Sequence, residues 1–178
     1  IGFGGVVLTA DVYGNEDHPC VVLLPSLTQT RKVWESAAKA LAQAGRYVIS
    51  LDLRGHGGSD SPKDCNYSLE AFMGDLVAVL SQLESRSVLV GSNFGGWIGL
   101  AAIGNTSAPI ATGLVLTNLP SEFQTLNNEG IAKTVSERAS SDDFEQNLFS
   151  GGFDFIELQN KLEPAAKNLK LPTLLVRG

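Results

Sequence analysis

The fold is decided by one stretch of this 178-residue sequence, Leu89-Val90-Gly91-Ser92-Asn93-Phe94-Gly95-Gly96-Trp97. A short apolar run typical of a buried strand leads into a turn with glycine two positions before and two positions after Asn93. A sharp strand-to-helix turn requires this arrangement, because only small flanking residues let the strand and the helix pack closely around a strained apex. If Ser92 were the apex, the flanking residues would be Val90 and Phe94, and neither is small. The spacing therefore assigns the apex to Asn93.

Strand-like and helix-like segments alternate on both sides of this turn. An opening antiparallel strand is predicted over Val6–Tyr13, and buried strands over Cys20–Leu24 and Tyr47–Leu53. Further strands are predicted over Ser87–Val90, Leu114–Thr117 and Thr173–Val176. Helices are predicted over Thr30–Ala44, over Leu69–Leu83 behind a Ser68 cap, and over Phe94–Ile103. Such alternation implies parallel pairing with right-handed crossovers. The expected fold class is α/β, a doubly wound, mostly parallel sheet with flanking helices.

Only the region from Pro120 to Leu171 breaks this alternation. It lacks a core-strand pattern, and its helices are predicted over Ile131–Arg138, Phe144–Leu148 and Phe155–Lys167. We therefore expect three parts: residues 1–119 as the first part of the core, 120–171 as a helical lid, and 172–178 as a returning core strand. Because the sequence stops straight after that strand, at Gly178, we expect a truncated domain whose C-terminal part is missing.

The composition of the chain indicates which classes of binding partner are not expected. The net charge is −6 without a Lys/Arg cluster, so a nucleic-acid partner is not expected. No apolar run approaches the ~20 residues that cross a bilayer, and no leader is recognisable, so no membrane partner is expected either. Cys20 and Cys65 lack metal-ligand spacing and are predicted to be reduced thiols of a cytoplasmic protein. We expect neither a metal nor a cofactor.

Three motifs in the correct order resemble the α/β-hydrolase fold family, of the serine-hydrolase-like type. Gly91–Trp97 is similar to the family's Gly-His-Ser-Phe-Gly-Gly-Trp, which forms its nucleophile elbow. Asp52–Asp60 resembles its Asp-x-Arg-Gly-x-Gly-x-Ser turn, and Val21–Trp34 resembles the segment that commonly contains Leu-Leu-His-Gly. The resemblance implies the α/β-hydrolase fold and relationship to hydrolases of esters or similar small carbonyl compounds. It does not by itself give an activity.

The elbow departs from the family at its catalytic position. A serine at the apex attacks the carbonyl after a histidine has taken its proton. Asn93 has no acidic proton to give and only a poorly nucleophilic nitrogen, so serine catalysis is not expected. Two interpretations of the asparagine at position 93 remain open. It is retained because asparagine tolerates strained backbone, or because its amide binds or polarises a ligand.

The oxyanion region also departs from the family, because Pro25-Ser26 stands where His-Gly is common. By position, the resemblance implies oxyanion donors at the backbone N–H groups of Leu27 and Phe94. Ser26 restricts a backbone that glycine leaves free. The expected elbow and pocket residues are Pro25, Ser26, Gly91, Ser92, Gly95, Gly96 and Trp97.

The sequence contains two histidines, and neither stands where the family has its base. His18 lies in a polar loop and is predicted to be solvated, and His56 lies in a turn that the resemblance implies is structural. The family's acid follows the strand predicted here over Thr173–Val176, and its histidine comes later still. Both positions would therefore fall after Gly178.

Four functional interpretations follow. The chain is related to ester hydrolases but lacks serine catalysis; or it is a non-catalytic module that binds a small apolar or ester-like ligand on the same fold. Alternatively, Asn93 stands where epoxide hydrolases and dehalogenases carry an aspartate nucleophile, although Phe94 replaces the bulky residue, often tryptophan, that usually follows it. The last interpretation is an inactive fragment.

Overall fold

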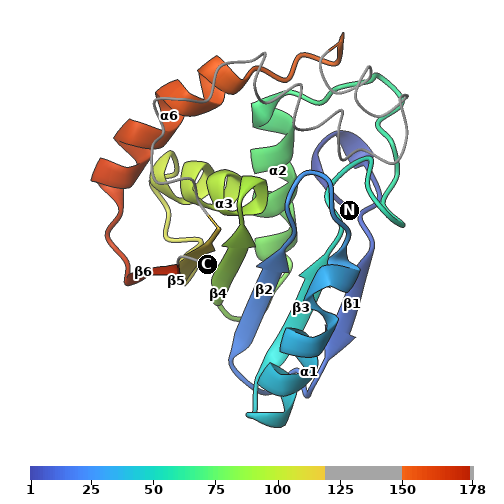
Figure 1. The fold of residues 1–178 in the computed structure, drawn as a ribbon, viewed down its shortest axis with the longest axis vertical. Helices are drawn as coiled ribbons and strands as arrows, with labels where there is room; N and C mark the ends of the chain where they lie inside the picture. Colours follow the sequence, from blue (N-terminus) through green and yellow to red (C-terminus); the bar gives the residue numbers. More distant parts are fainter. Residues whose placement is uncertain (119–149, 177–178) are drawn as a thin grey trace.

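The computed structural model describes residues 1–118 and 150–176 of the chain. Within them one six-stranded sheet has the order β1-β3-β2-β4-β5-β6 (Figure 1). Its strands are β1 (Ala10–Tyr13), β2 (Cys20–Leu24), β3 (Tyr47–Leu51), β4 (Ser87–Ser92), β5 (Ala111–Thr117) and β6 (Thr173–Val176). Only β1 runs antiparallel to its neighbour. The predicted α/β class, parallel sheet and antiparallel opening strand are confirmed.

The first strand is shorter than the predicted Val6–Tyr13. Val7 and Thr9 bond to the turn that follows β3: the Val7 carbonyl accepts from the Asp60 N–H at 2.9 Å, and the Thr9 N–H donates to Ser59 Oγ at 2.9 Å. Because those backbone groups are satisfied by a turn, strand pairing with β3 begins only at Ala10.

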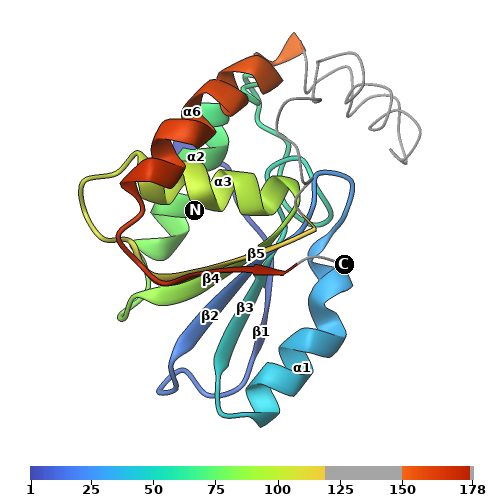
Figure 2. The same cartoon turned by 60° about the vertical axis from the view of Figure 1, so that its left-hand side comes forward.

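Helices cover both faces of the sheet. One face carries α1 (Glu35–Gln43), which follows a 3-10 helix over Arg31–Trp34; the other carries α2 (Leu69–Leu80), α3 (Phe94–Gly104) and α6 (Phe155–Asn168), as Figure 2 shows. Ser68 caps α2 as predicted, its Oγ accepting from the Ala71 N–H. The helix ends at Leu80, before the predicted Leu83, because the N–H groups of Gln82 and Leu83 bond three residues back in a tight final turn.

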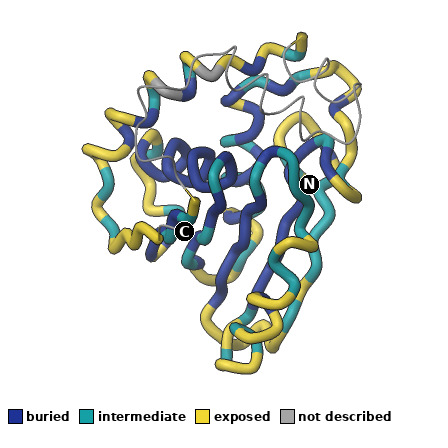
Figure 3. The backbone as a smooth tube through the Cα atoms, in the orientation of Figure 1, coloured by how far each residue is buried: buried dark blue, intermediate teal, exposed yellow. Residues whose placement is uncertain are grey.

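Helix α3 is the centre of the core. Every one of its residues is buried (Figure 3), and it packs between the sheet and helices α2 and α6. A β-carbon on Gly104 would lie 2.4 Å from Ala165 Cα, so the backbones of α3 and α6 are in direct contact. A parallel sheet must be covered on both faces, and a helix so enclosed is apolar on all its sides.

Part of the predicted lid region belongs to the described residues. The helix expected over Phe155–Lys167 is confirmed as α6, whose N-terminus is capped by Asp154. Phe153, Leu158 and Leu162 are buried in the main core cluster. The helices expected over Ile131–Arg138 and Phe144–Leu148 lie outside the described residues. None of the helices in the described part of the chain combines the length and apolar character that crossing a bilayer requires.

Candidate active site at the turn between β4 and α3

Asn93 connects β4 to α3 with a backbone that is rare for any residue other than glycine, φ 45° and ψ −112°. Two hydrogen bonds hold it in place: its N–H donates to the Thr117 carbonyl at 2.9 Å, and its carbonyl accepts from the Trp97 N–H at 3.0 Å. The left-handed region that asparagine tolerates has ψ near +30° to +60°. Asn93 therefore lies outside that region, at a cost of about 1–3 kcal/mol.

The glycines around Asn93 are required by close packing. A β-carbon on Gly91 would lie 2.5 Å from Gly96 Cα, and one on Gly95 would lie 2.4 Å from the Pro25 carbonyl oxygen. Strand β4, helix α3 and the loop after β2 thus meet with no room for side chains. One buried polar group stays unpaired in this region: the indole N–H of Trp97 has no hydrogen-bond partner among the described residues.

The loop that follows β2, Pro25–Thr30, lies beside this turn. In the sheet register Leu24 pairs with Gly91, so the loop and the elbow leave from neighbouring strand ends. The loop is closed by a bond from the Gln29 N–H to the Ser26 carbonyl at 3.0 Å. The Pro25 carbonyl oxygen lies against Gly95, and Leu27 and Phe94 belong to the same core cluster, so the loop reaches the first turn of α3.

His56 makes a contact that the sequence did not indicate. Its imidazole is buried, and its two nitrogens face backbone carbonyls: Nδ1 lies 2.9 Å from the Arg54 oxygen, and Nε2 is hydrogen-bonded to the Leu27 oxygen. Burial lowers the pKa of His56 below its ordinary 6.5, against smaller opposing effects of the two carbonyls and Asp52. His18 is exposed in the loop before β2, as expected.

Asp52 ties the same loop to β3. Its carboxylate is fully buried and accepts from the Arg31 N–H at 2.6 Å, from the Arg31 guanidinium, and from the Gly58 N–H at 2.8 Å. Arg31 also bonds Asp11 on β1 at 2.9 Å, and this bond is the main cause that raises the Arg31 pKa. Asp52 is thus committed to anchoring the loop between β2 and α1.

An aromatic cluster packs behind the turn. The ring of Phe94 meets those of Phe72 and Phe153 edge-on, each with a centroid separation of 5.2 Å. Close by, the Tyr67 N–H donates to the Gly151 carbonyl at 2.8 Å. Where the described chain resumes at Ser150, it therefore returns directly onto the residue that follows Asn93.

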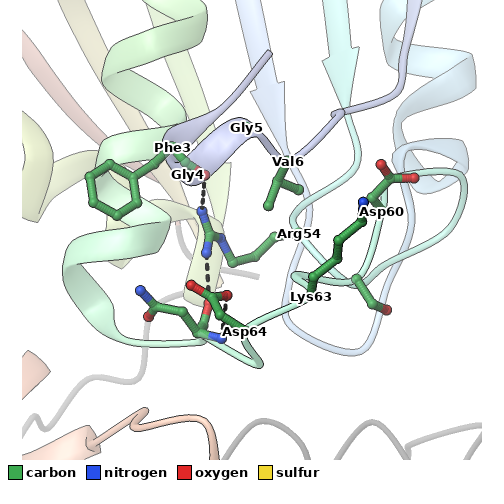
Figure 4. Close-up of a pocket in the computed structure, with 10 residues that line it drawn as sticks. Phe3, Gly4, Gly5, Val6, Arg54, Asp60, Lys63 and Asp64 are labelled. Carbon is green, nitrogen blue, oxygen red and sulfur yellow. Dashed lines mark hydrogen bonds between the residues drawn. The ribbon is translucent and has the colours of Figure 1, made fainter.

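A cavity of about 300 Å³ lies elsewhere, beside the N-terminal segment (Figure 4). Its lining includes Gly4, Lys63 and Arg54 but not Asn93. Arg54 is buried and paired with Asp75 through two hydrogen bonds of 2.7 Å, and it also donates to the Asn66 and Phe3 carbonyls. These bonds fix the N-terminal segment on α2.

Metal-ligating side chains do not gather in the part of the chain that the structure describes: no group of three His, Cys, Asp or Glu residues there could hold an ion.

Comparison with known proteins gives the family. The family model for the alpha/beta hydrolase fold matches residues 19–171. RutD of Variovorax paradoxus, a protein named for carbamate hydrolysis, is 34% identical over 109 residues, which are 61% of this chain and 41% of that protein. Epoxide hydrolase A of Mycobacterium tuberculosis is 33% identical over 93 residues, 51% of this chain and 29% of that protein. The chain thus spans less than half the length of these relatives.

A solved structure extends the likeness over nearly the whole chain. The thioesterase domain from the curacin biosynthetic pathway superimposes with a TM-score of 0.72 at 21% identity, covering 98% of this chain and 80% of that one. At that identity the likeness shows the fold alone. Together with the match of the family model, it shows that this chain belongs to the alpha/beta hydrolase fold family.

Proposed function

We propose that this protein binds a small ester or related carbonyl compound at the turn between β4 and α3, and that it forms no serine acyl-enzyme. The observation that carries this proposal is Asn93, which occupies the strained turn where the family resemblance implies a nucleophile. An asparagine amide cannot attack and release a leaving group as an activated serine does. It can donate a hydrogen bond to a ligand oxygen.

The strain at Asn93 supports a retained role for its side chain. If asparagine were present only because it tolerates positive φ, a ψ within the left-handed region would be expected. Its ψ of −112° lies far from that region. Strain of this kind persists where the surroundings impose it, and it concentrates at ligand sites.

Backbone groups supply the other proposed donors, the N–H groups of Leu27 and Phe94. Phe94 is the first residue of α3, and the first bond of that helix is donated by Trp97 to Asn93. The Phe94 N–H therefore has no acceptor within the helix, and the positive end of the helix dipole favours a ligand oxygen there. In this proposal the pocket wall is completed by Pro25, Ser26, Gly91, Ser92, Gly95, Gly96 and Trp97.

A second candidate is an aspartate-type hydrolase related to epoxide hydrolases or dehalogenases. The similarity to epoxide hydrolase A of Mycobacterium tuberculosis favours it. Asparagine differs from an aspartate nucleophile only by the amide, so deamidation of Asn93, or a single substitution, would supply the carboxylate. That carboxylate would attack a ligand carbon, breaking an epoxide C–O bond or expelling a halide, and so form an alkyl-enzyme ester. Water then hydrolyses the ester to the alcohol and regenerates the carboxylate.

The first test is covalent labelling of the full-length protein with a fluorophosphonate probe. Wild type should stay unlabelled, whereas Asn93→Ser should be labelled and should hydrolyse short p-nitrophenyl esters. Asn105→Ser, at the other end of α3, is the matched control and should stay unlabelled. Labelling of wild type would contradict the proposal. If Asn93→Ser is also unlabelled, the other catalytic groups are absent, and the measurement of ligand binding alone then tests the proposal.

Binding is measured as the rise in Tm with increasing concentrations of short alkyl esters. Wild type should be stabilised, and Asn93→Asp should bind about 3- to 10-fold more weakly because its carboxylate has no N–H to donate. If no ester stabilises wild type, the binding function is wrong. Turnover of epoxides or haloalkanes by Asn93→Asp would favour the second candidate. An intact mass of active wild type at the unmodified asparagine value would exclude deamidation as its source.

The proposal also includes a helical lid within 120–171, between the core of 1–119 and the returning strand of 172–178. Helix α6, which lies in that range, packs on α3 and belongs to the core. The ligand is a small apolar or ester-like molecule, without a nucleic-acid or membrane partner. A cytoplasmic location stays a prediction.

A further inference from the structure

The loop after β2 is held from one side, by β3 and the turn that follows it. Ser50 Oγ donates to the Arg31 carbonyl at 2.8 Å, and the Asp52 carboxylate accepts from the Arg31 N–H at 2.6 Å. These bonds fix the far end of the loop, where the 3-10 helix begins. Its near end is fixed by Pro25, whose carbonyl oxygen packs against Gly95.

Between those ends the contact of His56 with Leu27 ties the middle of the loop to the same turn. The Leu27 carbonyl and the following N–H belong to one planar peptide group, and rotation of that group reorients the Leu27 backbone. The Leu27 N–H belongs to the preceding peptide group, which is joined to this one through the φ and ψ rotations of Leu27. A partner fixed on the Leu27 carbonyl therefore restricts the ψ rotation, one of the two rotations that set the direction of the Leu27 N–H relative to that carbonyl. Since the side chain of Leu27 is also buried, the residue is held on two sides.

We propose that His56 is a positioning residue: its Nε2–H donates to the Leu27 carbonyl and so aims the Leu27 N–H at the ligand oxygen. The ligand in this inference is the one of the proposed function, on which the inference therefore rests. The contact between His56 and Leu27 is independent of that function. His56 does not touch the ligand. Its effect comes through the loop, because a donor misplaced by about 1 Å loses much of its stabilising effect.

Burial favours the neutral imidazole of His56, against the two carbonyl oxygens and Asp52, which favour its protonated form. The imidazole is buried between the Arg54 and Leu27 carbonyls, and among the described residues Asp52 is a charged group that acts on it. Asp52 is itself engaged by the Arg31 guanidinium, which offsets its attraction for a proton on His56. A neutral ring carries one proton, and the proposal places that proton on Nε2. The Nδ1 lone pair then faces the Arg54 oxygen at 2.9 Å, a repulsive contact between two acceptors that the bond to Leu27 must outweigh.

NMR of the full-length protein labelled with ¹⁵N and ¹³C tests the contact without any ligand. Long-range ¹H–¹⁵N spectra should show the Nε2–H tautomer of His56 at neutral pH. His56→Phe should shift the Leu27 carbonyl ¹³C resonance and the Leu27 and Thr28 amides, and His56→Gln, whose amide can donate, should restore part of the shift. Ser59→Ala is the matched control: it removes bonds to Thr9 and Asp52 within the same turn but none to the loop. An Nδ1–H tautomer, or equal shifts at Leu27 in Ser59→Ala, would overturn the proposal.

The functional consequence is measured in the Asn93→Ser background as the rate of fluorophosphonate labelling. Adding His56→Phe should slow labelling roughly 10- to 100-fold, with partial recovery for His56→Gln, whereas adding Ser59→Ala should change it less than about 3-fold. An unchanged rate in His56→Phe would overturn the positioning role. If Asn93→Ser is not labelled at all, the proposed site fails as a reactive centre, and the NMR result alone then decides the role of His56.

Discussion

Gly95 and Pro25 touch so closely that a β-carbon built on Gly95 would lie 2.4 Å from the Pro25 carbonyl oxygen. The first turn of α3 and the loop after β2 are thereby locked together, and these two segments carry the proposed donors Phe94 and Leu27. The positions of both donors therefore depend in part on this backbone contact.

Gly95→Ala should consequently destabilise the protein. The added methyl group must displace the backbone of Pro25, and overpacking of a core costs about 1–3 kcal/mol. Gly99→Ala is the control in the same helix, because its β-carbon would meet Leu114, Leu24 and Leu89 only at ordinary contact distances of 3.6–3.8 Å. Urea unfolding should show a loss for Gly95→Ala and no loss, or a gain of up to about 1 kcal/mol, for Gly99→Ala. Equal effects would contradict the close contact.

Asn93→Gly should increase stability, because glycine adopts φ 45°, ψ −112° without a side-chain penalty. Relief of strain predicts a gain of about 1 kcal/mol or more in the free energy of unfolding. The same change should abolish ester binding if the Asn93 amide holds the ligand. Asn105→Gly, at a residue with φ −101°, has no such strain to relieve and should not stabilise. A destabilised Asn93→Gly would show that the side chain contributes more to folding than its backbone costs.

The two cysteines should differ sharply in reactivity. Cys20 is buried in β2, and burial raises the pKa of its thiol to about 11, whereas Cys65 is exposed. Since the thiolate is the reactive form, iodoacetamide should alkylate Cys65 in the native protein and Cys20 only after unfolding. Peptide mass spectrometry after a timed exposure would read out both sites, and Cys65→Ser should leave the native protein unreactive. Rapid native alkylation of Cys20 would contradict its burial.

The lowered pKa of His56 predicts a loss of stability in mild acid. Above the unfolded value of about 6.5 the residue is neutral in both states, and its contribution is complete. As the pH falls below that value, the unfolded chain binds a proton that the folded chain does not, so the free energy of unfolding decreases by up to ~1.4 kcal/mol per pH unit. The loss stops at the folded pKa. Urea unfolding between about pH 5 and pH 7 should show a shallower decline for His56→Gln than for wild type; identical slopes would contradict the assignment.

Much of the fold could be predicted from local sequence. The apolar runs of β2, β4 and β5 and the cap at Ser68 depend on neighbouring residues. Each formed at the expected place, although β4 extends to Ser92 and β5 begins at Ala111. Glycines two before and two after Asn93 indicate a sharp turn whatever surrounds it. The asparagine at its apex is likewise a covalent fact of the chain, independent of how the chain folds.

Tertiary structure alone decided how these segments work together. His56 and Leu27 are 29 residues apart, and nothing in either segment indicates their contact, which exists because β2 and β3 are neighbours in the sheet. The packing of α6 on α3 likewise depends on Gly104 and Ala165 meeting across two elements distant in sequence. Local periodicity tells which face of an element is buried, but the partner on that face follows from strand order. The sequence by itself determined the turn and its asparagine; the sheet determined which loop lies beside it and what holds that loop.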